Sequence, residues 1–254
     1  WEAKKANLEM LQKQIESIKE KTEVVILPEM FSTGFSMKPK ILAEKMDGET
    51  VQWMKKIAAE KKIILTGSVI IEDPSTNTPE KKYFNRLIWM LPNGEYGIYD
   101  KRHLFAFADE QDHYSPGNKK LIASVKGWKI NLQVCYDLRF PVWTRQSPGD
   151  QENKYDLLIN VANWPQKRST AWKTLLRARA IENQCFVAGV NRTGEDGNKI
   201  FYNGESSIID PLGEIIYQRN EEDIFTYTLQ KEKVTETLNQ FPFWKDADSF
   251  RISE

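Results

Sequence analysis

The sequence predicts an α/β fold in which helices face two mixed β-sheets. Short apolar segments of strand length alternate with amphipathic segments of helical period along the 254 residues. Three pairs of strand segments flank tight turns that contain glycine, which is typical of antiparallel hairpins. Helices that alternate with strands, with hairpins interleaved, fit neither an all-parallel sheet nor a plain β-sandwich.

The first part of the chain is predicted to hold two helices and four strands. Apolar residues recur at helical spacing over 2–20 and 50–62, which predicts a helix over each range. The apolar run 24–27 suits a strand that is buried on both faces. The other expected elements are strands at 63–71, 86–91 and 95–100, a hairpin turn at Pro92-Asn93-Gly94 and a polar loop over 74–82.

The second part of the chain continues with one helix among further strands. Residues 169–183 are predicted to form the helix, with Ser169 as its cap. The expected strands are 121–125, 129–134, 155–163, 185–191, 206–210, 214–218 and 224–229, with hairpin turns at Lys126-Gly127-Trp128 and Pro211-Leu212-Gly213. Because no linker is long enough to demand a boundary, a single domain over 1–254 is expected.

Composition excludes several classes of partner. The 36 basic and 36 acidic residues cancel, so nothing in the charge favours nucleic acid or an anionic membrane. Two cysteines and two histidines do not suggest a disulfide framework or a structural zinc site, and a reducing cytoplasm is the expected location. No apolar run approaches 18 residues and no signal peptide is visible. Because the first residue is Trp1 rather than Met, the start of the protein is expected to precede it.

Chemically active side chains follow three of the expected strands. Glu29, Lys101 and Cys135 each lie at the end of an expected strand, and strand carboxyl ends are where open sheets place ligands. Taken singly, each has an ordinary alternative: a solvated acid, a solvated lysine, a small buried hydrophobe. Together they offer an acid or base, a cation and a thiol, which a covalent mechanism uses. Glu110 lies in an acidic loop, and Cys185 inside an apolar strand is expected to be inert.

The sequence lacks the motifs that are typical of other kinds of nucleophilic site. A Cys–His pair would have to use His103 or His113, and neither has a distinctive setting. The sequence contains no G-x-S-x-G elbow, no Walker loop and no GxGxxG.

Three motifs in order resemble the nitrilase superfamily of carbon–nitrogen hydrolases. LPEMF is similar to the segment with the family's glutamate, YDKRHLF to that with its lysine and QVCYDLRFP to that with its cysteine. ADEQDHYSPG resembles the segment of the second glutamate, and ANWP with WKTLLRARAIENQ also matches, so the resemblance covers nearly the whole chain. It implies a four-layer α-β-β-α sandwich and a homodimer. It also implies an N-terminal strand ahead of the first helix; this strand is missing from the sequence and is expected before Trp1.

The resemblance also implies roles for individual residues. Glu29 would be the general base, Cys135 the nucleophile that forms a thioester, and Lys101 the cation that stabilises the oxyanion together with the backbone N–H of Tyr136. Glu110 would hydrogen-bond near Lys101 and orient the substrate. The partners would be a small-molecule amide and water, with no metal or organic cofactor.

Within the family, LPEMFSTGFSM, CYDLRFPVW, ANWP and FPFWKDADSF are most similar to the omega-amidase branch. Members of that branch hydrolyse the terminal amide of short dicarboxylic acid monoamides such as 2-oxoglutaramate and succinamate and release ammonia. The distal carboxylate calls for a cation, and the candidates are Arg139, Arg168 and Arg177. Phe35 and Trp164 either wall the pocket or belong to the core.

Two other functions remain open from the sequence. One is a hydrolase with the same triad that acts on N-carbamoyl amino acids or aliphatic amides. The other is a non-catalytic binding protein of the same fold, which would not need the acid, the cation and the thiol together.

Overall fold

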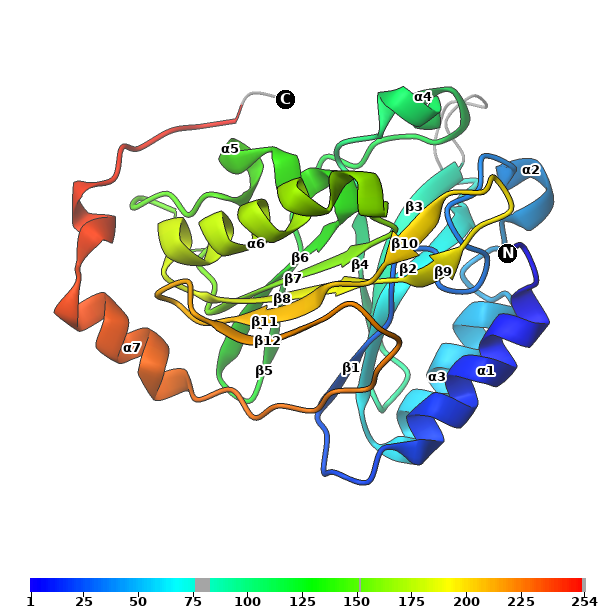
Figure 1. The fold of residues 1–254 in the computed structure, drawn as a ribbon, viewed down its shortest axis with the longest axis horizontal. Coiled ribbons are helices and arrows are strands. Elements are labelled where there is room, and N and C mark those ends of the chain that lie inside the picture. The colour runs from blue at the N-terminus through cyan, green and yellow to red at the C-terminus, as the bar shows by residue number, and fades with distance from the viewer. Residues whose placement is uncertain (76–82, 151, 253–254) are drawn as a thin grey trace. The chain divides into compact units, whose positions relative to one another are not determined.

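The computed structural model describes residues 1–75, 83–150 and 152–252 and forms two compact units (Figure 1). Unit 1 contains Trp1–Lys119, Glu195–Ile200 and Ile224–Thr226, and unit 2 contains the other described residues. Each unit has one main sheet with helices packed on it, which confirms the predicted alternation of helices with two mixed sheets. The assignment of residues 1–254 to a single domain stays a prediction.

The sheet of unit 1 has four strands. They are β1 (Val24–Ile26), β2 (Ile64–Glu72), β3 (Tyr83–Met90) and β4 (Tyr96–Asp100), in this spatial order. β1 is parallel to β2, and the other pairs are antiparallel. All four predicted strands are confirmed, but burial of β1 on both faces was wrong, because β1 is an edge strand and its residues are half-buried. Most of the expected loop 74–82 lies outside the described residues.

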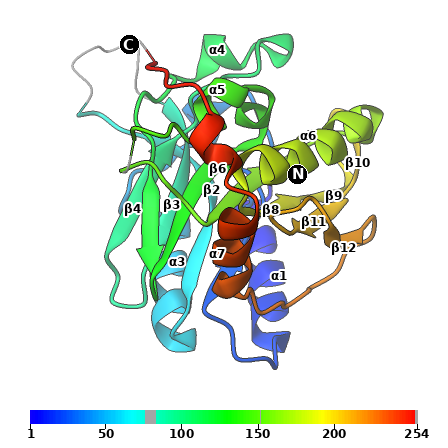
Figure 2. The same cartoon turned by 90° about the vertical axis from the view of Figure 1, so that its left-hand side faces the viewer.

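Two helices cover one face of this sheet. α1 (Lys4–Ser17) and α3 (Glu49–Lys61) lie side by side (Figures 1 and 2). Leu8, Leu11 and Ile15 of α1 share a hydrophobic core with α3 and with one face of β2 and β3. α1 is shorter than its predicted range because Ile18 already has an extended conformation. The short helices of unit 1 are α2 (Pro39–Leu42), η1 (Ala106–Ala108) and α4 (Glu110–His113).

The opposite face of this sheet carries polar side chains. Leu65, Val69 and Ile71 of β2 face the helices, so the intervening residues, Thr66, Ser68 and Ile70, face away from them because strand side chains alternate. Asn85 of β3 is the register partner of Ile70 and therefore shares that face. The sheet thus buries a polar row on the side away from α1 and α3.

The sheet of unit 2 has six strands in the order β12-β11-β8-β7-β6-β5. The central strands β6, β7 and β8 are parallel, and antiparallel pairs flank them. The bounds are β5 (Ile122–Val125), β6 (Trp128–Val134), β7 (Leu157–Ala162), β8 (Phe186–Asn191), β11 (Ser206–Ile209) and β12 (Ile215–Arg219). A separate two-stranded ribbon pairs β9 (Thr193–Glu195) with β10 (Phe201–Asn203).

The main helix of unit 2 is α6 (Ser169–Asn183), with the predicted bounds. Trp172, Leu176 and Ala180 pack on the sheet (Figure 1). The predicted cap was wrong: the N-cap residue is Arg168, and the Ser169 hydroxyl donates instead to the Glu205 carboxylate. The other helices are η2 (Cys135–Arg139), α5 (Pro141–Thr144), η3 (Gln166–Arg168), α7 (Lys231–Gln240) and η4 (Phe243–Asp246).

The predicted strand over 224–229 was wrong. The described structure assigns no strand to these residues, and Ile224, Phe225 and Tyr227 are exposed. Alternating β-branched and aromatic residues give strand propensity, but a strand also needs a neighbouring edge to bond. α7, which follows, was not predicted; its buried residues are Val234 and Thr237. Within the described ranges, no helix has the length and apolar character needed to cross a membrane.

Gly117 allows a close approach of two backbone segments at the end of β4. Its N–H donates to the Lys101 carbonyl at 3.0 Å, and a Cβ at this position would lie 2.2 Å from the Asp100 carbonyl oxygen. We expect Gly117→Ala to lower the free energy of unfolding by about 1–3 kcal/mol, because backbone must move to relieve the overlap. Urea unfolding measures this change. Gly149→Ala is the control, since a Cβ there meets no described atom within 4 Å, and an equal loss in both variants would contradict the prediction.

Candidate active site

The predicted site residues fall into two groups. Glu29, Lys101, Glu110 and Phe35 belong to unit 1, and the structure brings them together. Cys135, Tyr136, Arg139 and Trp164 belong to unit 2, where they form a second neighbourhood.

Glu29 follows β1 on a segment that β2 holds in place. The Met30 N–H donates to the Ser68 hydroxyl at 2.8 Å, and the Phe31 N–H donates to the Ser68 carbonyl at 3.2 Å. Met30 has a φ of 43°, which is uncommon for a residue with a side chain. These bonds turn the chain sharply after Glu29, whose side chain is buried.

Lys101 joins the two carboxylates of unit 1. Its Nζ lies 3.0 Å from Glu29 Oε1 and 3.0 and 2.8 Å from the two oxygens of Glu110. All three side chains are at most 1% exposed. Ionised groups this far from water persist only when they are paired and hydrogen-bonded, so the ordinary alternative of a solvated lysine and solvated acids was wrong.

Glu110 is the first residue of α4 and accepts a further bond from the Phe105 N–H at 2.6 Å. The pKa of the Glu110 carboxyl is raised above its ordinary value, because burial and the Glu29 carboxylate raise it more than the Lys101 ammonium lowers it. The named bonds to Glu110 all come from donors, and this geometry favours the ionised form. We therefore treat Glu110 as a carboxylate held between the cost of burial and the attraction of Lys101.

Two aromatic residues complete the surroundings of this cluster. The Phe35 ring centroid lies 5.1 Å from Lys101 Nζ, a cation–π contact. The Tyr114 hydroxyl donates to the Ser36 carbonyl at 2.5 Å, and burial raises the pKa of this phenol far above its ordinary value. Tyr114 is thus a neutral donor beside the charged residues.

Cys135 comes directly after β6, as predicted. It has a φ of 46°, and its thiol lies 4.0 Å from the Asn163 carbonyl oxygen. The turn is fixed by Asp137, a buried carboxylate that accepts the Val134 N–H at 3.1 Å. Residues with strained backbone conformations are found more often at functional sites, where the surrounding structure holds them in place.

Arg139 and Arg168 lie in the neighbourhood of Cys135. The Arg139 guanidinium stands 4.9 Å from the centroid of the Trp164 ring, and the indole N–H of Trp164 donates to the Arg168 carbonyl at 2.8 Å. Burial lowers the pKa of the Arg168 guanidinium, the Cys135 thiol raises it, and the Arg139 cation lowers it. The third candidate, Arg177, is half exposed on α6 and lies near Glu214, so the structure gives it no link to Cys135.

The structure confirms that Trp164 is a core residue, whereas its role as a pocket wall stays a prediction. It is 3% exposed and packs against Trp172 at 5.4 Å between ring centroids, so it belongs to the core of unit 2. Its other contacts place it beside Arg139. The side-chain amide of Asn191 makes two hydrogen bonds to the backbone of Trp164. It donates to the Trp164 carbonyl at 2.9 Å and accepts from the Trp164 N–H at 2.7 Å.

Sequence reasoning missed Asn85, Asp137 and Asn191. Asn85 Nδ2 donates to Glu29 Oε1 at 2.7 Å and to Glu110 Oε1 at 3.3 Å. The pattern that could have shown it is a single amide, next to Arg86, inside the mainly apolar stretch YFNRLIWM. Asp137 and Asn191 hold backbone at strand ends, where a polar residue is ordinary in a sequence.

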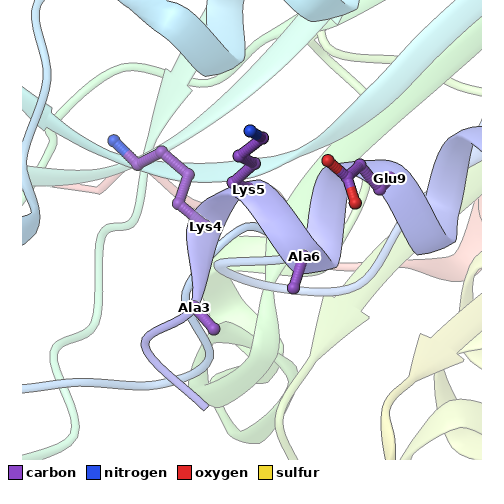
Figure 3. Close-up of a pocket in the computed structure, with 5 residues that line it drawn as sticks. All are labelled: Ala3, Lys4, Lys5, Ala6 and Glu9. Atoms are coloured by element: carbon purple, nitrogen blue, oxygen red, sulfur yellow. The ribbon is translucent and has the colours of Figure 1, made fainter.

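A surface hollow elsewhere in unit 1 holds none of these residues. It lies over the first turns of α1 and is lined by Ala3, Lys4, Lys5, Ala6 and Glu9 (Figure 3). Lys4 already pairs with Glu44 at 2.5 Å. Among the described residues, no group of three or more His, Cys, Asp or Glu side chains is placed to hold a metal ion. The chemistry is therefore sought in the Glu29–Lys101–Glu110 cluster and around Cys135.

Comparison with known sequences gives a consistent set of relatives. Residues 1–238 match the profile of a family described as carbon–nitrogen hydrolase. The chain is 42% identical to Omega-amidase YafV of Escherichia coli (strain K12) over 254 residues, which cover 99% of this chain and 94% of that protein. It is 34% identical to 2-oxoglutaramate amidase of Bacillus subtilis (strain 168) over 236 residues, which cover 91% and 87%.

Solved structures include a similar protein, XC1258 from Xanthomonas campestris. It is described as a CN-hydrolase superfamily protein with an arsenic adduct in the active site. It has a TM-score of 0.93 and 43% sequence identity, with 100% of this chain and 95% of that chain covered. The likeness thus extends over the whole described fold.

Proposed function

Because the chain belongs to the carbon–nitrogen hydrolase family, we propose that it is an omega-amidase. It would cleave the terminal amide of short dicarboxylic acid monoamides, such as 2-oxoglutaramate and succinamate, and release ammonia. The relatives named Omega-amidase and 2-oxoglutaramate amidase support this substrate class. The observation that carries the proposal is the fully buried ammonium of Lys101 between the carboxylates of Glu29 and Glu110.

The proposed reaction runs through a covalent intermediate. Glu29 takes the proton of the Cys135 thiol as sulfur attacks the amide carbonyl, and then passes this proton to the departing ammonia. A thioester on Cys135 remains. Glu29 next removes a proton from water as the water oxygen attacks the thioester. The carboxylic acid product is released, and the proton returns to the sulfur to restore the free thiol of Cys135. An amide is a poor electrophile with a poor leaving group, so dividing the reaction into two steps lowers each barrier.

Lys101 and the backbone N–H of Tyr136 would stabilise the negative oxygen that forms when sulfur attacks. Such donors act strongly where water is excluded, and removing one typically costs about 3–4 kcal/mol of transition-state stabilisation. Lys101 can remain charged throughout because Glu29 and Glu110 neutralise it in the resting enzyme. Glu110 holds the ammonium and orients the substrate.

Arg139 is the proposed partner of the distal carboxylate, with Arg168 beside it. A guanidinium can bind a carboxylate through two parallel N–H bonds, which selects substrates that end in a carboxylate. The cation–π contact of Arg139 with the Trp164 ring, at 4.9 Å to its centroid, would help to position the guanidinium. Phe35 and Trp164 would enclose the short chain between the amide and this carboxylate.

The first experiment is a panel of substrates at equal concentration. We expect ammonia from 2-oxoglutaramate and succinamate, and little from glutamine, N-carbamoyl-β-alanine and a simple nitrile. Ammonia with carbon dioxide from the carbamoyl compound would assign the enzyme to another carbon–nitrogen hydrolase activity. The absence of ammonia from all five would remove the amidase proposal.

We also propose that the enzyme is a homodimer in the cytoplasm, as the family resemblance implies. Light scattering of the purified protein measures its mass in solution, and a monomeric mass would contradict the dimer.

Detection of the tagged protein outside the cytoplasm would contradict the proposed location.

A further inference from the structure

Asn85 is a buried amide that the reaction described above does not use. It lies inside β3 and is fully buried, between Phe84 and Arg86 along the strand. Its backbone carbonyl accepts the backbone N–H of Lys101 at 3.0 Å, so the paired strands place the two side chains next to each other. Removing an amide from water is costly unless hydrogen bonds compensate for it, and the bonds of Asn85 therefore matter.

The orientation of the Asn85 amide follows from its neighbours. Nδ2 lies 2.7 Å from Glu29 Oε1 and 3.3 Å from Glu110 Oε1. Ionised carboxylates only accept hydrogen bonds, so the NH₂ group must face them and Oδ1 must face away. With two hydrogens, one amide serves both carboxylates at once.

The charges explain why such a donor is useful here. The cluster holds two carboxylates and one ammonium, all at most 1% exposed. The carboxylates repel each other, and the Lys101 ammonium attracts both. A neutral donor between them adds attraction without adding charge.

We propose that Asn85 is a positioning residue that locks the carboxylates of Glu29 and Glu110 around Lys101 and so holds Glu29 in place as the base. Glu29 Oε1 accepts from Lys101 at 3.0 Å and from Asn85 at 2.7 Å. Glu110 Oε1 accepts from the same two groups, at 3.0 and 3.3 Å. One pair of donors thus fixes both carboxylates. The catalytic consequence rests on the proposed function, whereas the locking of the carboxylates does not.

The other end of the amide reduces what Asn85 can contribute to fold stability. Its Oδ1 is buried and has no hydrogen-bond partner among the described residues. A buried acceptor without a partner destabilises the fold by about 1–3 kcal/mol. The two bonds of Nδ2 to the carboxylates must offset this cost, so they are the contacts through which Asn85 acts.

Crystal structures and kinetics of three variants test the proposal. Asn85→Leu keeps the number and branching of the side-chain heavy atoms but removes both donors, and Asn85→Ser keeps one hydroxyl donor but leaves a void. We expect the Lys101 Nζ–Glu29 Oε1 contact to be lost in Asn85→Leu and kcat to fall about 100-fold with little change in KM. Asn85→Ser should lose less, whereas a packing role would make serine the worse replacement.

Thr66→Val is the matched control. Thr66 lies on the same face of the sheet, is fully buried, and its hydroxyl has no partner in the described part of the chain. This variant should keep both the carboxylate positions and kcat. Unmoved carboxylates in Asn85→Leu, or a kcat equal to that of Thr66→Val, would overturn the proposal. If the parent enzyme cleaves no amide, displaced carboxylates in Asn85→Leu still support the locking role, and the proposed function alone is withdrawn.

Discussion

Replacing Cys135 by alanine should abolish ammonia release and leave the fold intact. Without the thiol no thioester forms, and no other described residue was assigned the role of nucleophile. The turn at this position is held by the bond from Val134 N–H to Asp137 rather than by the thiol. Alanine meets the same backbone constraint at a φ of 46° as cysteine does. We therefore expect the free energy of unfolding to change by less than about 1 kcal/mol.

Cys185→Ala is the control for this variant. Cys185 is fully buried, and burial raises the pKa of its thiol far above the ordinary value. The change should cost stability but preserve turnover per folded molecule. In the parent protein an alkylating reagent should label Cys135 well before Cys185, because the thiolate is the reactive form and only Cys135 is partly exposed. Full activity in purified Cys135→Ala would remove the covalent mechanism.

Replacing Lys101 by methionine should be the most disruptive single change in unit 1. It leaves two buried carboxylates without their cation, and breaking a buried pair in this way costs about 3–5 kcal/mol. It also removes the proposed oxyanion donor, for which we expect a loss of about 100-fold or more in kcat. Urea unfolding and steady-state kinetics measure the two effects separately.

Two companion variants separate charge from catalysis. Lys38→Met removes an exposed lysine that pairs with Glu2 at 2.9 Å, and should cost at most about 1 kcal/mol. Combining Lys101→Met with Glu110→Gln removes one uncompensated carboxylate and should restore part of the stability but no turnover. A combined variant that recovers turnover along with stability would contradict the role of Lys101 in the reaction.

Some features were missed or misplaced for a common reason. The burial of Glu110, the bridge made by Asn85 and the exposed chain at 224–229 all depend on segments that are distant in sequence. Asn85 is 56 residues from Glu29, and Lys101 is 72 residues from it. No local pattern states which carboxylate will meet which donor, and local propensity does not show whether a strand has a neighbour to pair with.

The sequence by itself determined the alternation of helices and strands, the hairpins, and an acid, a cation and a thiol that each follow a strand. These features are local, because side-chain periodicity and turn residues act over a few positions. The resemblance of the motifs to the carbon–nitrogen hydrolases was confirmed by the relatives. Only the tertiary structure decided that Lys101 is buried between Glu29 and Glu110 with Asn85 beside them, because burial and charge pairing arise when distant strands align in one sheet.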